Sequence, residues 1–245
     1  DSEYNEEALN YKELGTLLIE ISLRVIASKK NLICYGLSTN KHLEKKKYVD
    51  YLSRVIKGAD LFSVRDRNSL ETLNNLGICT KQIPIVKDLV LANQELKRVV
   101  KKDNSREKIL RIGLNLICDD YTMERFPVFV KQLQKFAKES KYEKIYVTLI
   151  PFYEYLNIDS YSYKNLLEKY NCKETWQIAP FARTMRDLVS ILDQQDVVIA
   201  MRYHCSLISG ILGIPTMAVC YDKHPHYLNK IMALKDIVDT INIEM

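Results

Sequence analysis

Five consecutive apolar residues, Val197 to Met201, are followed at once by Arg202 and then, two positions later, by His204. An unbroken apolar run, without polar alternation, is typical of a strand that is covered on both faces of a parallel sheet. In open α/β sheets, ligands bind at the edge formed by the carboxyl ends of the strands. The run therefore predicts a parallel α/β fold, with Arg202 and His204 at its ligand-binding edge.

A second apolar run, Pro215 to Cys220, also ends in polar residues, here Tyr221 and Lys223. We expect this run to be the neighbouring parallel strand, so that its carboxyl end lies beside the end of the first strand. The four polar side chains that follow the two runs then surround one crevice. A guanidinium, an ammonium group and an imidazole, which exchanges a proton near neutral pH, favour a small and strongly anionic substrate.

The composition is that of a soluble globular protein. The 245 residues are enough for one large or two small α/β domains, and 47% of them are hydrophobic, so a core can form without disulfides. The six cysteines are scattered singly, which favours a reducing cytoplasm over a disulfide framework or a zinc site. No signal peptide and no apolar stretch of about twenty residues is visible. The net charge of +5 is modest and the lysines are spread over expected helices, which disfavours nucleic-acid binding.

Strand-like and helix-like segments alternate along the chain, which predicts a parallel sheet with right-handed crossovers in each of two domains. The highly charged segment 96–107 is the expected linker, so that the domains span residues 1–100 and 108–245. Strands are expected over 31–36, 59–64, 109–114, 144–151, 176–179, 197–201 and 215–220. Helices are expected over 6–27, 41–58, 68–76, 125–138, 161–170, 183–192, 205–212 and 226–238, the last of which can cross back to the first domain.

Several blocks of residues lie in a distinctive order along the chain. They are Tyr35-Gly36, Ser63 to Ser69 followed by Leu76-Gly77, Asp88, and Asp196 to Lys223. The last block has a fixed order of parts. It begins with an Asp and an apolar strand, continues with Arg-x-His, a helix, Gly-x-Pro and a second apolar strand, and ends with Tyr-Asp-Lys. Together the blocks resemble the polysaccharide pyruvyl transferase family over most of the chain. The family's opening strand and its Gly/Asn/Asp-rich loop are absent, so we expect an N-terminal domain that is incomplete in this chain.

The resemblance implies two Rossmann-like domains of the glycosyltransferase-B type, with the active site between them. It implies an enzyme that transfers a pyruvyl group from phosphoenolpyruvate to two hydroxyls of a sugar, forming a ketal. The acceptor would be a sugar of a cell-surface glycan or of its lipid-linked precursor. Such an acceptor would bring a cytoplasmic enzyme into peripheral contact with the membrane.

The predicted site residues suit this chemistry. Arg202 and Arg65 end strands in different domains and can bind the carboxylate and phosphate of the donor through paired N–H groups. Lys223 would add a point charge, and Tyr221 lies beside it in the motif. His204 would protonate the methylene carbon of the donor as a general acid. The chemistry requires neither a metal ion nor another cofactor.

Several residues also have a structural interpretation. Arg65 can form a local ion pair with the aspartate that follows it, and Asp88 either lines the cleft or caps the next turn. The tyrosine-rich segment 152–163 can stack on a sugar ring, although interfacial packing is the favoured interpretation. His224 and His226 are expected to be exposed loop residues rather than metal ligands.

Two other functions remain open at this point. The first is a nucleotide-sugar-dependent glycosyltransferase of the same architecture, which needs an acidic residue placed to bind a ribose. Glu154 and Asp159 are poor candidates for that role. The second is a non-catalytic, glycan-binding member of the same fold, which would be favoured if the natural protein lacked the N-terminal part of the cleft.

Overall fold

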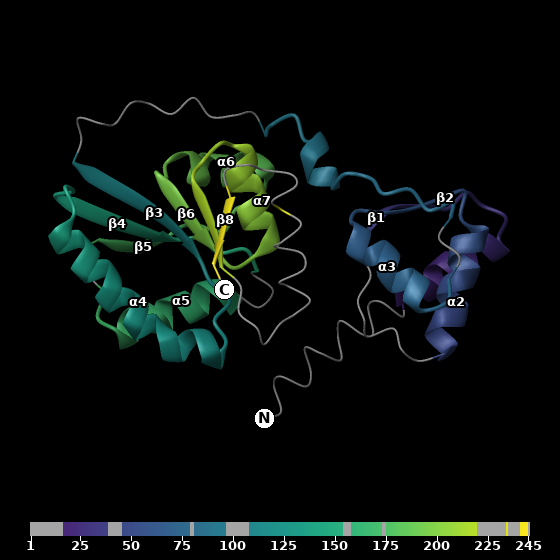
Figure 1. Cartoon of the computed structure of the whole chain (residues 1–245), viewed down its shortest axis with the longest axis horizontal. Helices are drawn as coiled ribbons and strands as arrows, with labels where there is room; N and C mark the ends of the chain where they lie inside the picture. Colours follow the sequence, from purple (N-terminus) through teal and green to yellow (C-terminus); the bar gives the residue numbers. More distant parts are fainter. Residues whose placement is uncertain are drawn as a thin grey trace. The chain divides into compact units, whose positions relative to one another are not determined.

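The computed structural model describes residues 17–38, 46–78, 81–96, 108–153, 158–172, 175–219, 234 and 241–244. The chain forms two compact units, Asp1–Ala92 and Asn93–Met245. In the described part of each unit, parallel strands are connected by helices (Figure 1). The predicted fold class, α/β with parallel sheets, is therefore confirmed.

The first unit is built on two parallel strands, β1 (Ile33–Leu37) and β2 (Leu61–Val64). Helix α2 (Lys46–Gly58) precedes β2, and α3 (Arg67–Asn75) follows it. The segment 17–27, before β1, is also helical. These elements lie where the spacing of apolar residues predicts them.

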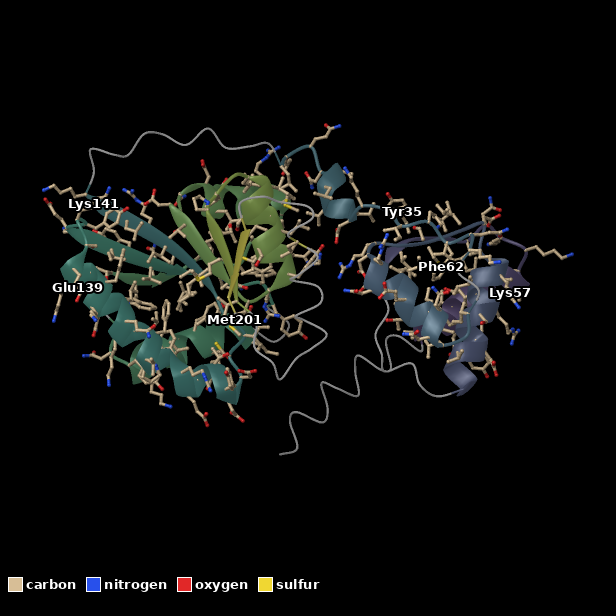
Figure 2. All side chains as sticks on the ribbon, viewed as in Figure 1. Tyr35, Lys57, Phe62, Glu139, Lys141 and Met201 are labelled. Carbon is tan, nitrogen blue, oxygen red and sulfur yellow. The ribbon has the colours of Figure 1, made fainter. Side chains whose placement is uncertain are left out.

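The core of the first unit lies between its sheet and its helices. Phe62 of β2 points into this layer and is buried, whereas Tyr35 of β1 points to the opposite face and is exposed (Figure 2). The two side chains differ because successive residues of a strand point to opposite faces of the sheet. The buried apolar residues of this layer are Leu52, Val55, Phe62, Val64, Leu73, Ile78 and Ile83.

The second unit contains a parallel sheet with six strands in its described residues. They are β3 (Ile109–Asn115), β4 (Lys144–Leu149), β5 (Trp176–Ile178), β6 (Val197–Ala200), β7 (Thr216–Val219) and β8 (Ile241–Glu244). Their order across the sheet is β5-β4-β3-β6-β7-β8. With β3 counted as the first strand, this is the 3-2-1-4-5-6 order of a doubly wound Rossmann sheet. In such sheets the ligand crevice lies where the order reverses, here outside the carboxyl ends of β3 and β6.

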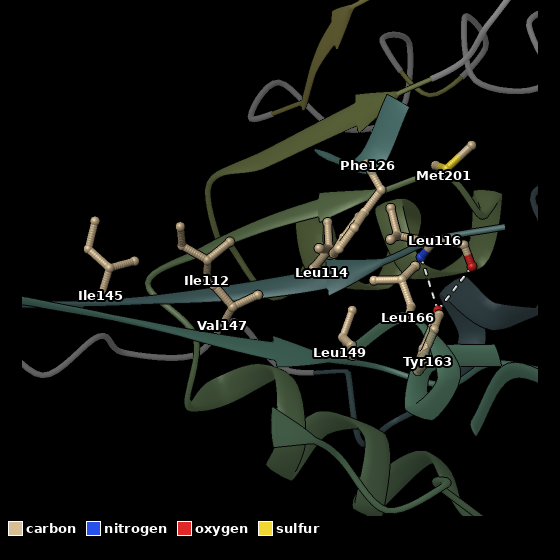
Figure 3. Close-up of a cluster of buried hydrophobic side chains, with 10 residues drawn as sticks. All are labelled: Ile112, Leu114, Leu116, Phe126, Ile145, Val147, Leu149, Tyr163, Leu166 and Met201. Carbon is tan, nitrogen blue, oxygen red and sulfur yellow. Dashed lines mark hydrogen bonds between the residues drawn. The ribbon is translucent and has the colours of Figure 1, made fainter. Parts of the chain in front are cut away.

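Helices cover both faces of this sheet (Figure 1). Helices α4 (Asp120–Glu139) and α5 (Ile158–Lys169) lie on one face, and α6 (Met185–Asp193) and α7 (Tyr203–Ile211) lie on the other. Because both faces are covered, the central strands are nearly continuous apolar runs. The buried residues at the centre of the α4–α5 side, drawn in Figure 3, are Ile112, Leu114, Leu116, Phe126, Ile145, Val147, Leu149, Tyr163, Leu166 and Met201.

Helix α4 begins five residues earlier than the predicted helix over 125–138. Asp119 is its N-cap, and the helix continues through Pro127, which sequence reasoning alone would place near a helix start. A proline has no N–H to donate to the carbonyl four residues earlier, which is that of Met123. The Tyr170 hydroxyl donates to this carbonyl instead, at 3.2 Å, so the proline leaves no carbonyl unpaired. None of the helices in the described ranges is long and apolar enough to cross a membrane.

The C-terminal region differs from expectation in one element. Strand β8 extends the sheet beyond β7 and was not predicted, because its sequence Ile-Asn-Ile-Glu is short and alternates apolar with polar residues. Such alternation suits an edge strand better than the apolar runs that revealed the central strands. Apart from Leu234, the expected helix over 226–238 lies outside the described residues, as does most of the expected linker.

Candidate functional site

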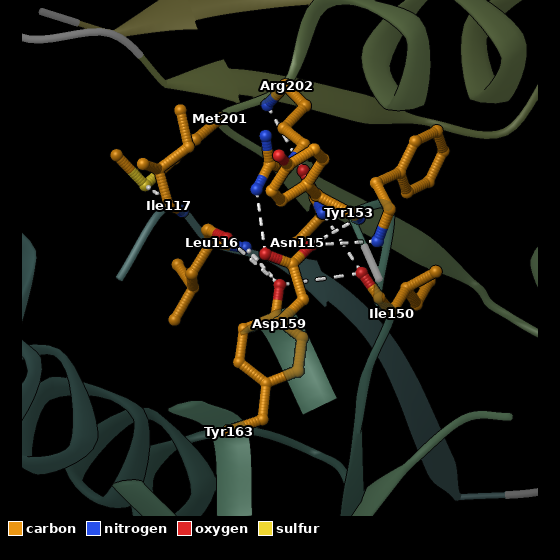
Figure 4. A network of polar contacts seen from close by, with 10 residues as sticks. Asn115, Leu116, Ile117, Ile150, Tyr153, Asp159, Tyr163, Met201 and Arg202 are labelled. Atoms are coloured by element: carbon orange, nitrogen blue, oxygen red, sulfur yellow. Dashed lines mark hydrogen bonds and ion pairs between the residues drawn. The ribbon is translucent and has the colours of Figure 1, made fainter. Parts of the chain in front are cut away.

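The carboxyl ends of β4, β3 and β6 are held together by one buried side chain, that of Asn115 (Figure 4). Asn115 ends β3 and is fully buried. Its Nδ2 donates to the carbonyl of Ile150 at 2.9 Å, and its Oδ1 accepts from the backbone N–H of Arg202 at 3.1 Å. On the main chain, the N–H of Met201 donates to the carbonyl of Asn115. The start of α7 is thereby fixed relative to the end of β4.

Replacing Asn115 by leucine should lower the free energy of unfolding by about 3 kcal/mol, because it leaves a buried carbonyl and a buried N–H without their partners. Urea denaturation of the purified variant measures this loss. The same change at Asn165, an exposed residue of α5, is the matched control and should alter the free energy by less than about 0.5 kcal/mol. Equal effects of the two substitutions would contradict the role of Asn115.

The guanidinium of Arg202 forms an ion pair with a buried carboxylate. Its Nη2 donates to Oδ1 of Asp159 at 2.7 Å, and the two side chains are 22% and 4% exposed. The other carboxylate oxygen of Asp159 accepts from the backbone N–H groups of Phe152 and Tyr153, both at 2.8 Å. The Tyr153 ring lies beside the guanidinium, with 5.7 Å between the ring centroid and Cζ. Arg202 is thus held at the sheet edge in one orientation (Figure 4).

His204 lies in the first turn of α7, two residues after this arginine. Arg202 is the N-cap of α7 and has extended backbone, and its side chain makes no capping hydrogen bond. The imidazole is exposed and meets the ring of Tyr203 edge-on, at 5.1 Å between centroids. The structure therefore places the imidazole and the guanidinium at the same sheet edge, where the strand order reverses.

Tyr163 of α5 contacts the chain directly after β3. Its fully buried hydroxyl accepts from the N–H of Leu116 at 3.0 Å and donates to the carbonyl of Leu116 at 2.9 Å (Figure 3). Burial raises the pKa of this phenol well above its ordinary value. The hydroxyl pairs the N–H and the carbonyl of Leu116, the first residue after β3, so this tyrosine has a packing role. Residues 154–157 of the tyrosine-rich segment lie outside the described residues.

The described cysteines are unsuited to nucleophilic chemistry. Cys34, Cys118, Cys172 and Cys205 are all free thiols. Burial raises the pKa of Cys118 and of Cys205 to about 12, so both stay protonated at neutral pH, and Cys205 is fully buried. The packing role expected for Cys205 agrees with this environment.

Cys205→Ser should be tolerated near neutral pH, because a serine hydroxyl can donate to the carbonyl four residues earlier, that of Met201 just before α7. The substitution should also make the free energy of unfolding decrease less steeply at high pH. The unfolded thiol ionises near its ordinary value of 9.0, whereas the native thiol keeps its proton until about pH 12. Between pH 9 and 12 the native state therefore binds more protons than the unfolded state, so the free energy of unfolding falls as the pH rises. The contribution of the neutral thiol to stability is complete below pH 9 and is lost as the pH rises toward 12.

Denaturation curves at several pH values measure this difference. Between pH 9 and 12, wild-type protein should lose about 1.4 kcal/mol more per pH unit than the serine variant. Parallel pH profiles of the two proteins would contradict the assignment. A loss of activity in the variant at full stability would show that the thiol takes part in the chemistry.

In the first unit, Arg65 follows β2 and is paired locally. Its Nη1 lies 3.0 Å from Oδ2 of Asp88, and its Nε lies 3.6 Å from Oδ2 of Asp66. Asp66 also caps α3 by accepting from the N–H of Ser69 at 2.7 Å, and Asp88 accepts from the N–H of Val90 at 3.0 Å. Both aspartates therefore have the structural roles that were open for them. A role of Arg65 in binding stays a prediction.

Two of the predicted site residues, Tyr221 and Lys223, lie outside the described residues, as do His224 and His226. Within the described ranges, no group of three or more His, Cys, Asp or Glu side chains is placed to hold a metal ion. From the predicted set, Arg202 and His204 both lie at the start of α7, directly after β6.

Sequence reasoning missed two residues of this edge, Asn115 and Asp159. A signal for Asn115 exists, since it is a polar residue at the end of an apolar strand. Asp159 was considered only as a poor ribose ligand. Its pairing with Arg202 joins residues 43 positions apart, and no local pattern reveals it.

The doubly wound sheet of one unit and the smaller α/β unit give a fold of the glycosyltransferase-B-like type, and solved structures support this fold. The structure of Anabaena Alr3699/HepE in complex with UDP and glucose is 10% identical, with a TM-score of 0.55 over 84% of this chain and 57% of that chain. The UDP-GlcNAc 2-epimerase from Methanocaldococcus jannaschii is 10% identical, with a TM-score of 0.54 over 91% of this chain and 62% of that chain. The chain thus spans about three-fifths of the length of these structures, and the similarity concerns the fold alone.

The sequence identifies the family more closely than the fold does. The family model for polysaccharide pyruvyl transferase matches residues 8–223. The chain belongs to the polysaccharide pyruvyl transferase family, as the motif blocks predicted. No curated protein matches the chain.

Proposed function

We propose that the protein is a transferase that moves a pyruvyl group from phosphoenolpyruvate to two hydroxyls of a sugar. Membership of the polysaccharide pyruvyl transferase family supports this reaction. The observation that supports the proposal most is the position of Arg202 and His204 at the start of α7, directly after β6, a strand beside the switch point of the Rossmann sheet. The acceptor would be a cell-surface glycan or its lipid-linked precursor, and the enzyme would act in the cytoplasm, in peripheral contact with the membrane.

The donor would bind to Arg202. A guanidinium has five N–H donors in a planar fork that suits a carboxylate or a phosphate. Asp159 uses Nη2, whereas Nε is buried and has no hydrogen-bond partner in the described part of the chain. The dipole of α7, which starts at this arginine, also favours an anion. Arg65, Tyr221 and Lys223 remain predicted contributors to the same donor site.

His204 would supply the proton for the first step. Protonation of the methylene carbon turns it into a methyl group and makes the adjacent carbon electrophilic. One sugar hydroxyl adds to that carbon, and the bond to the phosphate oxygen breaks. The second hydroxyl then closes the ketal, so that one hydroxyl proton replaces the proton given to carbon and the other leaves with phosphate. Nearby cations would stabilise the departing phosphate.

A transfer assay tests the proposal. Purified protein is incubated with phosphoenolpyruvate and a panel of sugar acceptors, and products are analysed by mass spectrometry while inorganic phosphate is measured. The expected result is one pyruvyl ketal on an acceptor for each phosphate released. Transfer of a sugar from a nucleotide sugar, without use of phosphoenolpyruvate, would instead identify a glycosyltransferase. Acceptor binding without turnover of either donor would identify a glycan-binding protein.

A further inference from the structure

We infer that Asp159 is a positioning residue, which orients the guanidinium of Arg202 toward a bound anion. The inference rests on the proposed donor site. Asp159 is almost completely buried, with 3% of its surface exposed, and it comes from the start of α5 rather than from the strand that carries the arginine. A side chain this buried does not contact a ligand itself, and its hydrogen bond to Arg202 is the contact through which we expect it to act (Figure 4).

The contacts of Asp159 use both of its carboxylate oxygens. Oδ1 accepts from Nη2 of Arg202 at 2.7 Å, and Oδ2 accepts from the N–H groups of Phe152 and Tyr153. The N–H of Asp159 itself donates to the carbonyl of Tyr153 at 3.0 Å. A carboxylate with these bonds has little freedom to turn. It fixes the direction of the Arg202 side chain relative to the segment that follows β4.

The position of this ion pair favours a role in binding over a role in stability alone. A buried ion pair is weak evidence for stability, because the loss of hydration opposes the attraction between the charges. Asp159 and Arg202 reach across the end of β3, from the β4 side to the β6 side, at the edge where Rossmann sheets bind ligands. An arginine held in a fixed orientation loses less side-chain entropy when it binds an anion.

The same sheet offers a matched control at its opposite edge. Asp196 precedes β6 and accepts from the backbone N–H of Arg111 in β3 at 2.8 Å. The Nη1 of Arg111 lies 3.9 Å from the same carboxylate. This aspartate also joins β3 to β6 beside an arginine, but it lies at the amino ends of the strands. Its replacement removes a comparable contact without touching the proposed site.

The test measures donor affinity by calorimetry in the intact protein. Asp159→Asn should weaken the binding of phosphoenolpyruvate about tenfold, because the charged hydrogen bond that orients the guanidinium is lost. Asp196→Asn should leave the affinity within about twofold of wild type. Thermal unfolding of each variant shows whether it is folded. If the asparagine variant does not fold, Asp159→Glu keeps the charge but displaces it by one methylene, and the same loss of affinity is expected.

A double-mutant cycle separates positioning from general destabilisation. Because Asp159 acts through the guanidinium, Asp159→Asn should change donor affinity by less than about twofold when it is added to Arg202→Lys. A tenfold loss in that background would show an effect that does not pass through the guanidinium and would overturn the inference. So would wild-type affinity in the folded Asp159→Asn variant, although the proposed function would stand.

Inorganic phosphate, used as a second probe, distinguishes the two proposals. If wild-type protein binds phosphate but not phosphoenolpyruvate, the proposed donor is wrong, and the same cycle with phosphate still decides the role of Asp159. If wild-type protein binds neither anion, both the donor site and the positioning role are rejected.

Discussion

Replacing His204 by alanine is expected to lower kcat about 1000-fold, because the variant loses the group proposed to protonate the donor carbon. Donor affinity should stay within about twofold, since Arg202 and its partner Asp159 do not depend on the imidazole. Stability should also be unchanged within about 0.5 kcal/mol, because the side chain is exposed in the first turn of α7. The measurements are steady-state kinetics of phosphate release, calorimetry with phosphoenolpyruvate, and thermal unfolding.

Two further variants make this test specific. His204→Gln keeps hydrogen-bonding capacity but cannot exchange a proton near neutral pH, so it should be as inactive as the alanine variant. Imidazole added to the alanine variant should restore part of its activity if a proton is the missing element. Lys144→Ala, an exposed change at the opposite edge of the sheet, is the control and should be fully active. Activity of His204→Ala within a few-fold of wild type would reject the role as general acid.

The second large effect, on donor affinity, is expected at Arg202. Two substitutions separate the contribution of its positive charge from that of its planar geometry. Arg202→Lys should weaken donor binding at least tenfold, because a planar fork becomes a point charge that cannot make paired hydrogen bonds. Arg202→Leu should in addition lower the free energy of unfolding by about 3 kcal/mol, because the buried carboxylate of Asp159 loses its countercharge. Calorimetry with phosphoenolpyruvate and urea denaturation measure the two effects.

Arg111 provides the corresponding control variants. It lies at the amino edge of the same sheet, and its side chain is 31% exposed beside Asp196. Arg111→Lys should leave donor affinity unchanged, and Arg111→Leu should destabilise the protein less than Arg202→Leu, since its carboxylate partner is 28% exposed. Wild-type donor affinity in Arg202→Lys would show that the guanidinium does not hold the donor.

The predictable parts of the fold are the elements whose own residues form a recognisable pattern. The apolar runs revealed β3, β4, β6 and β7, because a strand covered on both faces is nearly continuously apolar. Arg202 and His204 were found together because they follow one of these strands directly. Helix α4 was predicted over 125–138 and begins five residues earlier, after its N-cap Asp119. The hydroxyl of Tyr170, which pairs the carbonyl left by Pro127, is distant in sequence. Strand β8 is too short and too polar to stand out.

The supporting residues of the site could not be predicted in the same way. Asn115 and Asp159 act on Arg202 through hydrogen bonds to partners 87 and 43 positions away. Only the strand order brings these partners together, and no periodicity in the sequence encodes that order. Sequence reasoning therefore identified side chains that would face a ligand and missed those that hold them in place.

The pairing of β3 with β6 has a consequence for when the proposed donor site forms during folding. These strands are adjacent in the sheet, although two other strands and three helices lie between them in the chain. Contacts between such distant segments form late, because a long loop must first be closed. A chain in which β3 and β6 are not yet paired would therefore lack the proposed donor site. Small anions that bind this site would bind the folded sheet and not the unfolded chain. An excess of such an anion should therefore raise the melting temperature of the protein.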